Sequence, residues 1–194
     1  MMSMEEFQIV SFSPNDAPSP NDILKIFLSQ HIHTIKAESI HAISCEFSLE
    51  NSTSKKIMMI SVPDITRTYE GLTDVSFYFI FVHLQKLNSH KNFEAICSYI
   101  NKYCDLNKKI FVFGVLNDDF FRKTMTKEMV KKIMDEKLGK NINYQYYEIN
   151  MMNKKEIGDI IFNIFLKKNF SQKRQILTDK KKDVGHKAHS CVFY

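Results

Sequence analysis

Two continuous apolar runs, 75–84 and 109–116, constrain the fold of this chain more than any other feature. A strand with one face in water alternates apolar and polar residues, whereas a strand buried on both faces is apolar along its length. Between the two runs, Phe93, Ile96 and Ile100 recur at helical spacing. A strand, a helix and a second strand in succession form a parallel unit. The two runs therefore predict a parallel sheet with helices on both faces.

The remaining segments continue this alternation of strands and helices. The expected strands are 7–12, 42–49, 56–62 and 144–149, and the expected helices are 23–35, one from Ser89, one from Thr126 to Gly139 and one from Asn153. Polar turn residues after position 50 join two of these strands into a predicted hairpin. About a dozen residues separate position 62 from position 75, which leaves room for one helical turn at most. The whole pattern predicts an α/β fold with a mostly parallel, six-stranded sheet.

Charge is divided unevenly between a near-neutral body and a basic tail. The net charge of the chain is +5, and the residues after 166 contain eight Lys or Arg against two Asp. We therefore expect one folded domain over 1–166 and a flexible basic tail over 167–194. Such a tail either contacts an anionic surface, such as a membrane, or serves as a solvated extension. The folded body, being near neutral, is not expected to bind nucleic acid.

Hydropathy and cysteine usage indicate the expected compartment. The chain has no apolar run of about 18 residues, the length that would cross a membrane. It begins MMSMEEFQIV, which is acidic before a short apolar run and therefore differs from a signal peptide. Its four cysteines are scattered, as in proteins whose thiols stay reduced. We expect an intracellular protein, either cytoplasmic or nuclear.

Two segments in the second half of the chain carry a family resemblance. They are DVSFYFIFVHLQKLNSHKNFEAICSYINKY (74–103) and YEINMMNKKEIGDIIFNIF (147–165). Together with the order of elements over 7–165, they resemble the Ras-like small GTPases, whose fold is of the P-loop NTPase type. The resemblance implies a mostly parallel six-stranded sheet with helices on both faces. In active members of the family it also implies bound GTP and Mg²⁺.

The loop after the first strand departs from the phosphate loop of that family. The motif Gly-x-x-x-x-Gly-Lys-Ser/Thr places backbone N–H groups, a lysine and a hydroxyl around the phosphates. At this spacing the chain has Ser13, Pro18, Ser19 and Pro20 instead. Proline has no N–H to donate, and the aspartate at position 16 would repel a triphosphate. We expect that no phosphate cradle of this type forms here.

The other motifs of the family are degenerate as well. The metal-linked Asp-x-x-Gly is represented by Asp64, with Arg67 in place of the glycine. The base-reading positions hold Val115, Leu116, Asn117 and Asp118 after one strand, and Asn150, Met151 and Met152 after the last strand. Of the motif Asn-Lys-x-Asp, the final aspartate is kept. We therefore expect no nucleotide, metal ion or other cofactor at these positions, no small-molecule substrate and no catalytic residue.

Among degenerate members of the family, the pattern is most similar to the centromere protein M family of kinetochore subunits. The shared features are the loop without glycine and lysine, a truncated segment SVPDITRTYEGLTD (61–74), and KKIFVFG (108–114) after an Asn- and Ser-rich helix start. This resemblance implies a catalytically inactive, GTPase-like scaffold that binds protein partners constitutively, because no nucleotide can switch it. The regions 13–22 and 63–74, free of nucleotide, are the expected partner surfaces.

The last four residues suggest an alternative function. Cys191 is followed by two apolar residues and a terminal tyrosine, and a polybasic stretch precedes it. This arrangement is similar to a prenylation signal, although tyrosine is not a usual final residue. One lipid chain with nearby lysines would hold a protein at an anionic membrane. The alternative is therefore a membrane-anchored, prenylated Ras- or Rab-like small GTPase with an altered loop.

Two further site hypotheses rest on isolated residues. His31, His33 and His41 lie near one another in sequence, but their spacing is not that of a structural zinc site. Asp118 and Asp119 follow a buried strand, where doubly wound sheets place ligands, and would be the acid and base of an unrelated enzyme. Aspartate is equally common there as a turn residue. We expect surface histidines and turn aspartates.

Overall fold

The computed structural model describes residues 5–14, 17–39, 41–48, 54–62, 64–69, 72–117 and 122–165. The chain divides into two units, Met1–Gly158 and Asp159–Tyr194. The boundary falls inside a last helix that covers residues 154–165. The fold and the sites below belong to the first unit. The basic tail, including Cys191, lies outside the described residues.

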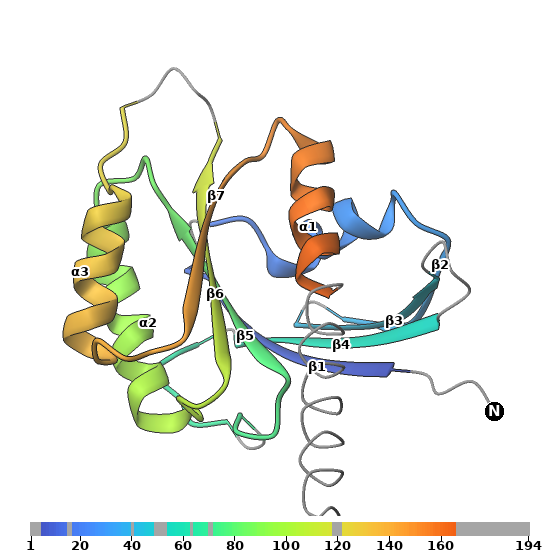
Figure 1. Cartoon of the computed structure of the whole chain (residues 1–194), viewed down its shortest axis with the longest axis horizontal. Coiled ribbons are helices and arrows are strands. Elements are labelled where there is room, and N and C mark those ends of the chain that lie inside the picture. The colour runs from blue at the N-terminus through green and yellow to red at the C-terminus, as the bar shows by residue number, and fades with distance from the viewer. Residues whose placement is uncertain are drawn as a thin grey trace, which may run out of the picture. The chain divides into compact units, whose positions relative to one another are not determined.

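The first unit is built on a seven-stranded sheet with strand order β2-β3-β4-β1-β5-β6-β7. The strands are β1 (Glu5–Phe12), β2 (His33–Glu38), β3 (Ala42–Ser48), β4 (Ser54–Val62), β5 (Phe77–His83), β6 (Lys109–Leu116) and β7 (Tyr144–Asn150). The pairs among β4, β1, β5, β6 and β7 are parallel, and β2, β3 and β4 pair antiparallel. The predicted α/β class with a mostly parallel sheet is thus confirmed (Figure 1).

Three helices of this unit are α1 (Pro20–Leu28), α2 (Ser89–Tyr103) and α3 (Lys127–Lys137). The hydroxyl of Thr126 accepts a hydrogen bond from the Met129 N–H at 3.4 Å, so the predicted cap of α3 is present. Gly139 ends this helix with φ of +104°, a conformation that glycine adopts without strain. At the start of the last helix, the Glu156 N–H donates to Asn153 Oδ1 at 3.2 Å. Local capping chemistry therefore fixes these helix ends as the sequence predicts.

The prediction of six strands is wrong, because the chain forms an additional edge strand, β2. The sequence pattern extended the first helix to Ile35, but α1 ends at Leu28. Thr34 and Ile35 have β-branched side chains, which favour a strand. β2 pairs antiparallel with β3, with an irregularity in register at Lys36. Between β4 and β5, the described residues contain a turn and no helix, in agreement with the short spacing there.

The two faces of the sheet bury different side chains. On the face covered by α2 and α3, aliphatic residues dominate, among them Ile80, Val82 and Val112 (Figure 1). The opposite face of β5 and β6 carries a layer of aromatic rings: Phe77, Phe79, Phe81, Phe111 and Phe113. Each of these rings is at least 96% buried, since none exceeds 4% exposure. The two apolar runs in the sequence therefore do correspond to strands buried on both faces.

Gly114 of β6 is required by a close approach rather than by backbone conformation. A Cβ at this position would lie 2.5 Å from the Tyr146 hydroxyl and 2.9 Å from Leu84 Cδ1. Replacing Gly114 with alanine is therefore expected to lower the free energy of unfolding by about 2 kcal/mol. In the matched variant Gly158→Ala, the methyl group would meet the exposed Gln30 amide, which can move away. We expect a change below about 1 kcal/mol there, because alanine also favours the helix. Urea unfolding of both variants measures this difference, and equal destabilisation would contradict it.

Candidate functional site

The carboxyl ends of β1 and β5 mark the position where a doubly wound sheet binds ligands. β1 leads through α1 toward β3 and β4 on one side of the sheet, whereas β5 leads through α2 to β6 on the other side. Adjacent strands whose connections leave in opposite directions define the switch point, and ligands bind outside it. The candidate site therefore lies between the loop 13–19 and the loop 84–88. This is also the position of the phosphate loop in the family that the sequence resembles.

The loop after β1 is closed by its own polar groups. The hydroxyl of Ser13 lies within hydrogen-bond distance of the carbonyl oxygens of Pro14 (3.3 Å) and Pro18 (3.1 Å). The N–H of Ala17 donates to the Pro14 carbonyl at 2.9 Å. A phosphate cradle needs backbone N–H groups that point together at a ligand. Here the Ser13 hydroxyl and the Ala17 N–H are used within the loop, and the prolines supply no N–H.

The start of α1 is also unlike a phosphate-binding helix end. Pro20 occupies the first helical position, and the N-cap residue Ser19 makes no side-chain cap bond. Asp22 places a carboxylate in the first turn, where it interacts favourably with the helix dipole. A helix N-terminus binds phosphate through its N–H groups and positive dipole end. In this chain the exposed Asp22 adds negative charge to the first turn, and Pro20 removes one of the donors.

Asp64, at the metal-linked position, is used in a local turn. Its Oδ1 accepts hydrogen bonds from the Thr66 N–H (2.8 Å) and the Thr66 hydroxyl (2.6 Å). Its Oδ2 lies 3.3 Å from Arg67 Nε. The hydrogen bonds from Thr66 are the main reason why the pKa of this carboxyl is below its ordinary value, and Arg67 lowers it further. Arg67, which stands where the family that the sequence resembles has a glycine, thus pairs with Asp64.

This geometry predicts that Mg²⁺ has no effect through Asp64. Replacing Asp64 with alanine removes hydrogen bonds within an exposed turn, so the free energy of unfolding should change little. We expect millimolar MgCl₂ to leave the unfolding curves of the parent protein and of Asp64→Ala unchanged. The measurement is thermal unfolding of both proteins with and without the salt. Stabilisation of the parent protein alone by Mg²⁺ would show that this carboxylate binds the ion.

Residues 115–117 and 150–152, which stand at the base-reading positions of the family that the sequence resembles, come together in space. Leu116 of β6 is the register partner of Asn150 of β7, and the Met151 N–H donates to the Leu116 carbonyl at 2.9 Å. Val115 is fully buried, and the Asn150 side chain accepts the Met152 N–H at 2.9 Å. The Met152 side chain is 81% exposed. Of the apolar side chains at these strand ends, Val115 is buried and Met152 is exposed to solvent. Asp118 and Asp119 lie outside the described residues.

The loop after β5 is held in place by hydrogen bonds to neighbouring loops. The Gln85 side chain accepts the Asn117 N–H at 3.0 Å, and its own N–H donates to His83 Nδ1 at 3.2 Å. The Thr124 hydroxyl donates to the Lys86 carbonyl at 2.8 Å, and the Thr124 N–H donates to the Leu84 carbonyl at 2.8 Å. These polar groups join the loops to one another. They link the loop after β5 to the loops after β6 at this end of the sheet.

The three histidines of the first half of the chain do not converge on a metal site. His33 and His41 are exposed, and the His31 ring lies against Phe27 in a tilted arrangement with centroids 4.7 Å apart. Within the described residues, no group of three or more His, Cys, Asp or Glu side chains converges in a way that could hold a metal ion. The same part of the chain contains no helix that is both long enough and apolar enough to cross a membrane.

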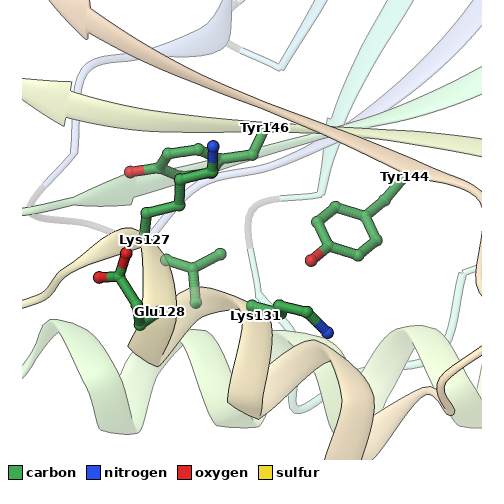
Figure 2. Close-up of a pocket in the computed structure, with 6 residues that line it drawn as sticks. Lys127, Glu128, Lys131, Tyr144 and Tyr146 are labelled. Atoms are coloured by element: carbon green, nitrogen blue, oxygen red, sulfur yellow. The ribbon is translucent and has the colours of Figure 1, made fainter.

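Sequence reasoning missed a pocket of about 360 Å³ between α3 and β7. It is lined by Lys127, Glu128, Val130, Lys131, Tyr144 and Tyr146. Figure 2 shows the two tyrosines reaching from β7 toward α3, whose first turns carry the charged residues. Burial raises the pKa of both tyrosine hydroxyls above the ordinary value, and the Tyr146 hydroxyl donates to Glu148 Oε1 at 3.2 Å. The signal in the sequence was the alternation of tyrosines at 144 and 146, which places both on one face of a strand.

At the carboxyl ends of β1, β5, β6 and β7, the described polar groups mostly bond to neighbouring loops. No known family model matches this chain, and no curated protein shows significant sequence similarity to it.

Proposed function

We propose that this chain is a catalytically inactive, GTPase-like scaffold that binds protein partners constitutively. The observation that carries the proposal is the loop after β1. Its serine hydroxyl and its Ala17 N–H are bonded within the loop, and three prolines at 14, 18 and 20 stand where N–H donors are needed. A protein without a nucleotide site has no nucleotide-dependent switch. Its interactions with partners are then permanent properties of its surface.

The arrangement of the sheet supports a Ras-like ancestry. β1 lies at the centre, the β3–β4 hairpin on one side and the parallel strands β5, β6 and β7 on the other. The edge strand β2 and the short connection after β4 are departures from the family pattern. The truncated connection is also the feature that favours the centromere protein M family among degenerate members. We therefore propose a kinetochore subunit as the specific form of this scaffold.

Nucleotide content of the purified protein tests this proposal. The full chain is purified without added nucleotide and denatured, and the released small molecules are separated by anion-exchange chromatography. The proposal predicts no guanine or adenine nucleotide in the extract. A stoichiometric amount of GTP, GDP or ATP would contradict it, because a nucleotide that survives purification requires an intact site.

A second candidate is favoured by the end of the chain, where Cys191 follows a polybasic stretch. In this case the protein is a prenylated, membrane-anchored relative of the Ras and Rab proteins, and anionic lipids are its contact surface. The test is the intact mass of the chain expressed in eukaryotic cells, compared with a Cys191→Ser variant. A prenyl adduct lost in the variant, together with measurable affinity for GTP, would establish this function in place of the scaffold.

A further inference from the structure

Half of one sheet face has no helix over it. Val10, Phe12 and Val62 belong to the core that α2 and α3 cover. Among the described residues, this core takes no side chain from β2 or β3 and only Val62 from β4. A right-handed crossover from β4 to β5 would run on the same face as α2, but its described part is a turn without a helix. The β2, β3 and β4 half of this face is therefore open to solvent.

A row of alternating charges crosses this half of the sheet. Strand register places Lys56 of β4 between Glu6 of β1 and Glu46 of β3. The Lys56 ammonium lies 3.0 Å from the Glu6 carboxylate, and the ammonium of Lys36 in β2 lies 3.5 Å from the Glu46 carboxylate. These side chains are 32–52% exposed. In the strand order β1, β4, β3, β2, the charges of the row are therefore negative, positive, negative and positive.

The rows beside the charged row combine large and small side chains. Because side chains alternate along a strand, Met58 and Ile60 of β4 point to the same face as Lys56. The residues next to them in β3 are Ser44 and Ala42. The Ile60 side chain is 42% exposed, and the other three are partly exposed. β4 thus forms a ridge on this face, and β3 forms a lower strip beside it.

This pattern of charge and size is complementary to itself. A two-fold axis parallel to the strands, between β3 and β4, would lay β4 of one copy over β3 of the other and β1 over β2. Each lysine of the charged row would then face a glutamate of the other copy. The ridge of β4 would face the small side chains of β3. A two-fold axis along the row would instead bring like charges together, so the first orientation is the favourable one.

We propose that this chain forms a two-fold symmetric homodimer by packing the open half of this sheet face against the same face of a second copy. Two packed sheets lie about 10 Å apart and cross at about 30°. With about 4.8 Å between strands and 3.4 Å between residues, the face measures roughly 400 Å² per copy. An interface of this size is small, so we expect a reversible dimer with a dissociation constant in the micromolar range. The inference does not depend on the proposed scaffold function.

Sedimentation velocity of the full chain tests whether the dimer forms. The protein is measured from about 5 to about 500 μM, the range that reveals a micromolar dissociation constant. A reducing agent is present so that disulfide bonds cannot link two copies. We expect the sedimentation coefficient to rise with concentration from that of a monomer to that of a dimer. A monomer at every concentration in this range would overturn the proposal.

Two single charge reversals should each weaken the dimer. In Glu46→Lys the new ammonium group would face Lys56 of the other copy, and in Lys56→Glu the new carboxylate would face Glu46. Both ion pairs lie at the surface, so the variants should fold. We expect the dissociation constant to rise at least about tenfold in each, because like charges that meet in an interface repel. A dimer unchanged by both reversals would overturn the proposal.

The matched controls are Glu136→Lys and Lys132→Glu on α3. They make the same changes in net charge at an ion pair with a distance of 3.9 Å that lies away from the open face. Both controls should dimerise as the parent protein does. Equal weakening by the controls and by the reversals on the open face would mean a general effect of net charge, and it would overturn the interface.

Mixing the two reversal variants distinguishes a contact between copies from damage within one copy. In a pair of one Glu46→Lys copy and one Lys56→Glu copy, every charge of the row faces an opposite charge. We therefore expect the mixture to form a heterodimer at least as tightly as the parent protein dimerises. With a fluorescent label on one variant, sedimentation reports this heterodimer alone. A labelled variant that stays monomeric in the mixture, while the parent protein dimerises, would assign the dimer to another surface and overturn the proposal.

The outcomes for the dimer and for the scaffold function are independent. Tight binding of GTP would contradict the scaffold, and the dimer would remain if the charge reversals behave as expected. A monomeric parent protein that binds no nucleotide would remove the dimer and leave the scaffold function unaffected.

Discussion

Replacing Phe79 with alanine is expected to lower the free energy of unfolding by about 4 kcal/mol. Phe79 lies in the middle of β5 and is 2% exposed. Its ring centroid is 5.0 Å from that of Phe113, 5.4 Å from Phe77 and 5.8 Å from Phe111. Alanine would remove the ring from the centre of the aromatic layer. A cavity would remain, because the neighbouring strands are held in the sheet and cannot move inward to fill it. Edge-to-face pairs such as Phe79–Phe113 contribute beyond the area they bury.

Guanidinium unfolding monitored by circular dichroism measures this effect. Phe79→Leu keeps much of the side-chain volume, so it should lower the free energy of unfolding by about 1.5 kcal/mol or less. Leu87→Ala removes an apolar side chain that is 79% exposed, so its effect should stay within about 0.5 kcal/mol. A loss below about 2 kcal/mol for Phe79→Ala would mean that the aromatic layer is loosely packed and is not the core of this face.

Replacing Tyr78 with phenylalanine is expected to lower the free energy of unfolding by about 2–3 kcal/mol, although only one oxygen atom is removed. The Tyr78 hydroxyl is buried, donates to the Leu72 carbonyl and accepts the Asp105 N–H at 3.0 Å. It therefore joins the segment after β4 to the turn after α2. Burial is the main reason why the pKa of this hydroxyl lies above its ordinary value. In the variant, a buried carbonyl and an N–H would lose their partner, and unsatisfied groups cost more than a hydrogen bond gains.

The control for this variant is Tyr147→Phe. The Tyr147 hydroxyl donates to Gln145 Oε1 at 3.0 Å at a partly buried position of the edge strand. Water can replace that hydrogen bond, so we expect Tyr147→Phe to lower the free energy of unfolding by less than about 1 kcal/mol. Hydrogen exchange adds a local readout, because the Asp105 N–H should lose protection in Tyr78→Phe. Equal stability of the two variants would contradict the bridging role of Tyr78.

Local chemistry and composition were enough to predict much of the fold. The run 75–84 indicated a strand buried on both faces, and Phe77–His83 is buried at every position. The helix ends at Thr126 and Gly139 could be predicted from the sequence, because capping depends on a few neighbouring residues. The absence of N–H donors at positions 18 and 20 also follows from the sequence alone, since proline has no N–H in any conformation.

Features that depend on distant pairing were not predictable in the same way. Residues 33–38 become a strand because β3 is there to pair with them, and their side chains are exposed on both faces, so no periodicity marks them. The pocket beside Lys127 needs β7 to lie next to α3 at the edge of the sheet. The partners of the Asp64 carboxylate could not be predicted either, because it is the turn that brings Thr66 and Arg67 to this side chain.

Isothermal titration calorimetry of the purified full chain with GTP and with GDP, each in the presence of Mg²⁺, measures whether the protein binds guanine nucleotide. We predict no heat of binding, because the Ser13 hydroxyl and the prolines leave the loop after β1 without a cradle for the phosphates and Asp64 is paired with Arg67. Binding at micromolar affinity or tighter would contradict it. In that case the loop 13–19 would have to open and bind phosphate in a way that its prolines and internal hydrogen bonds argue against.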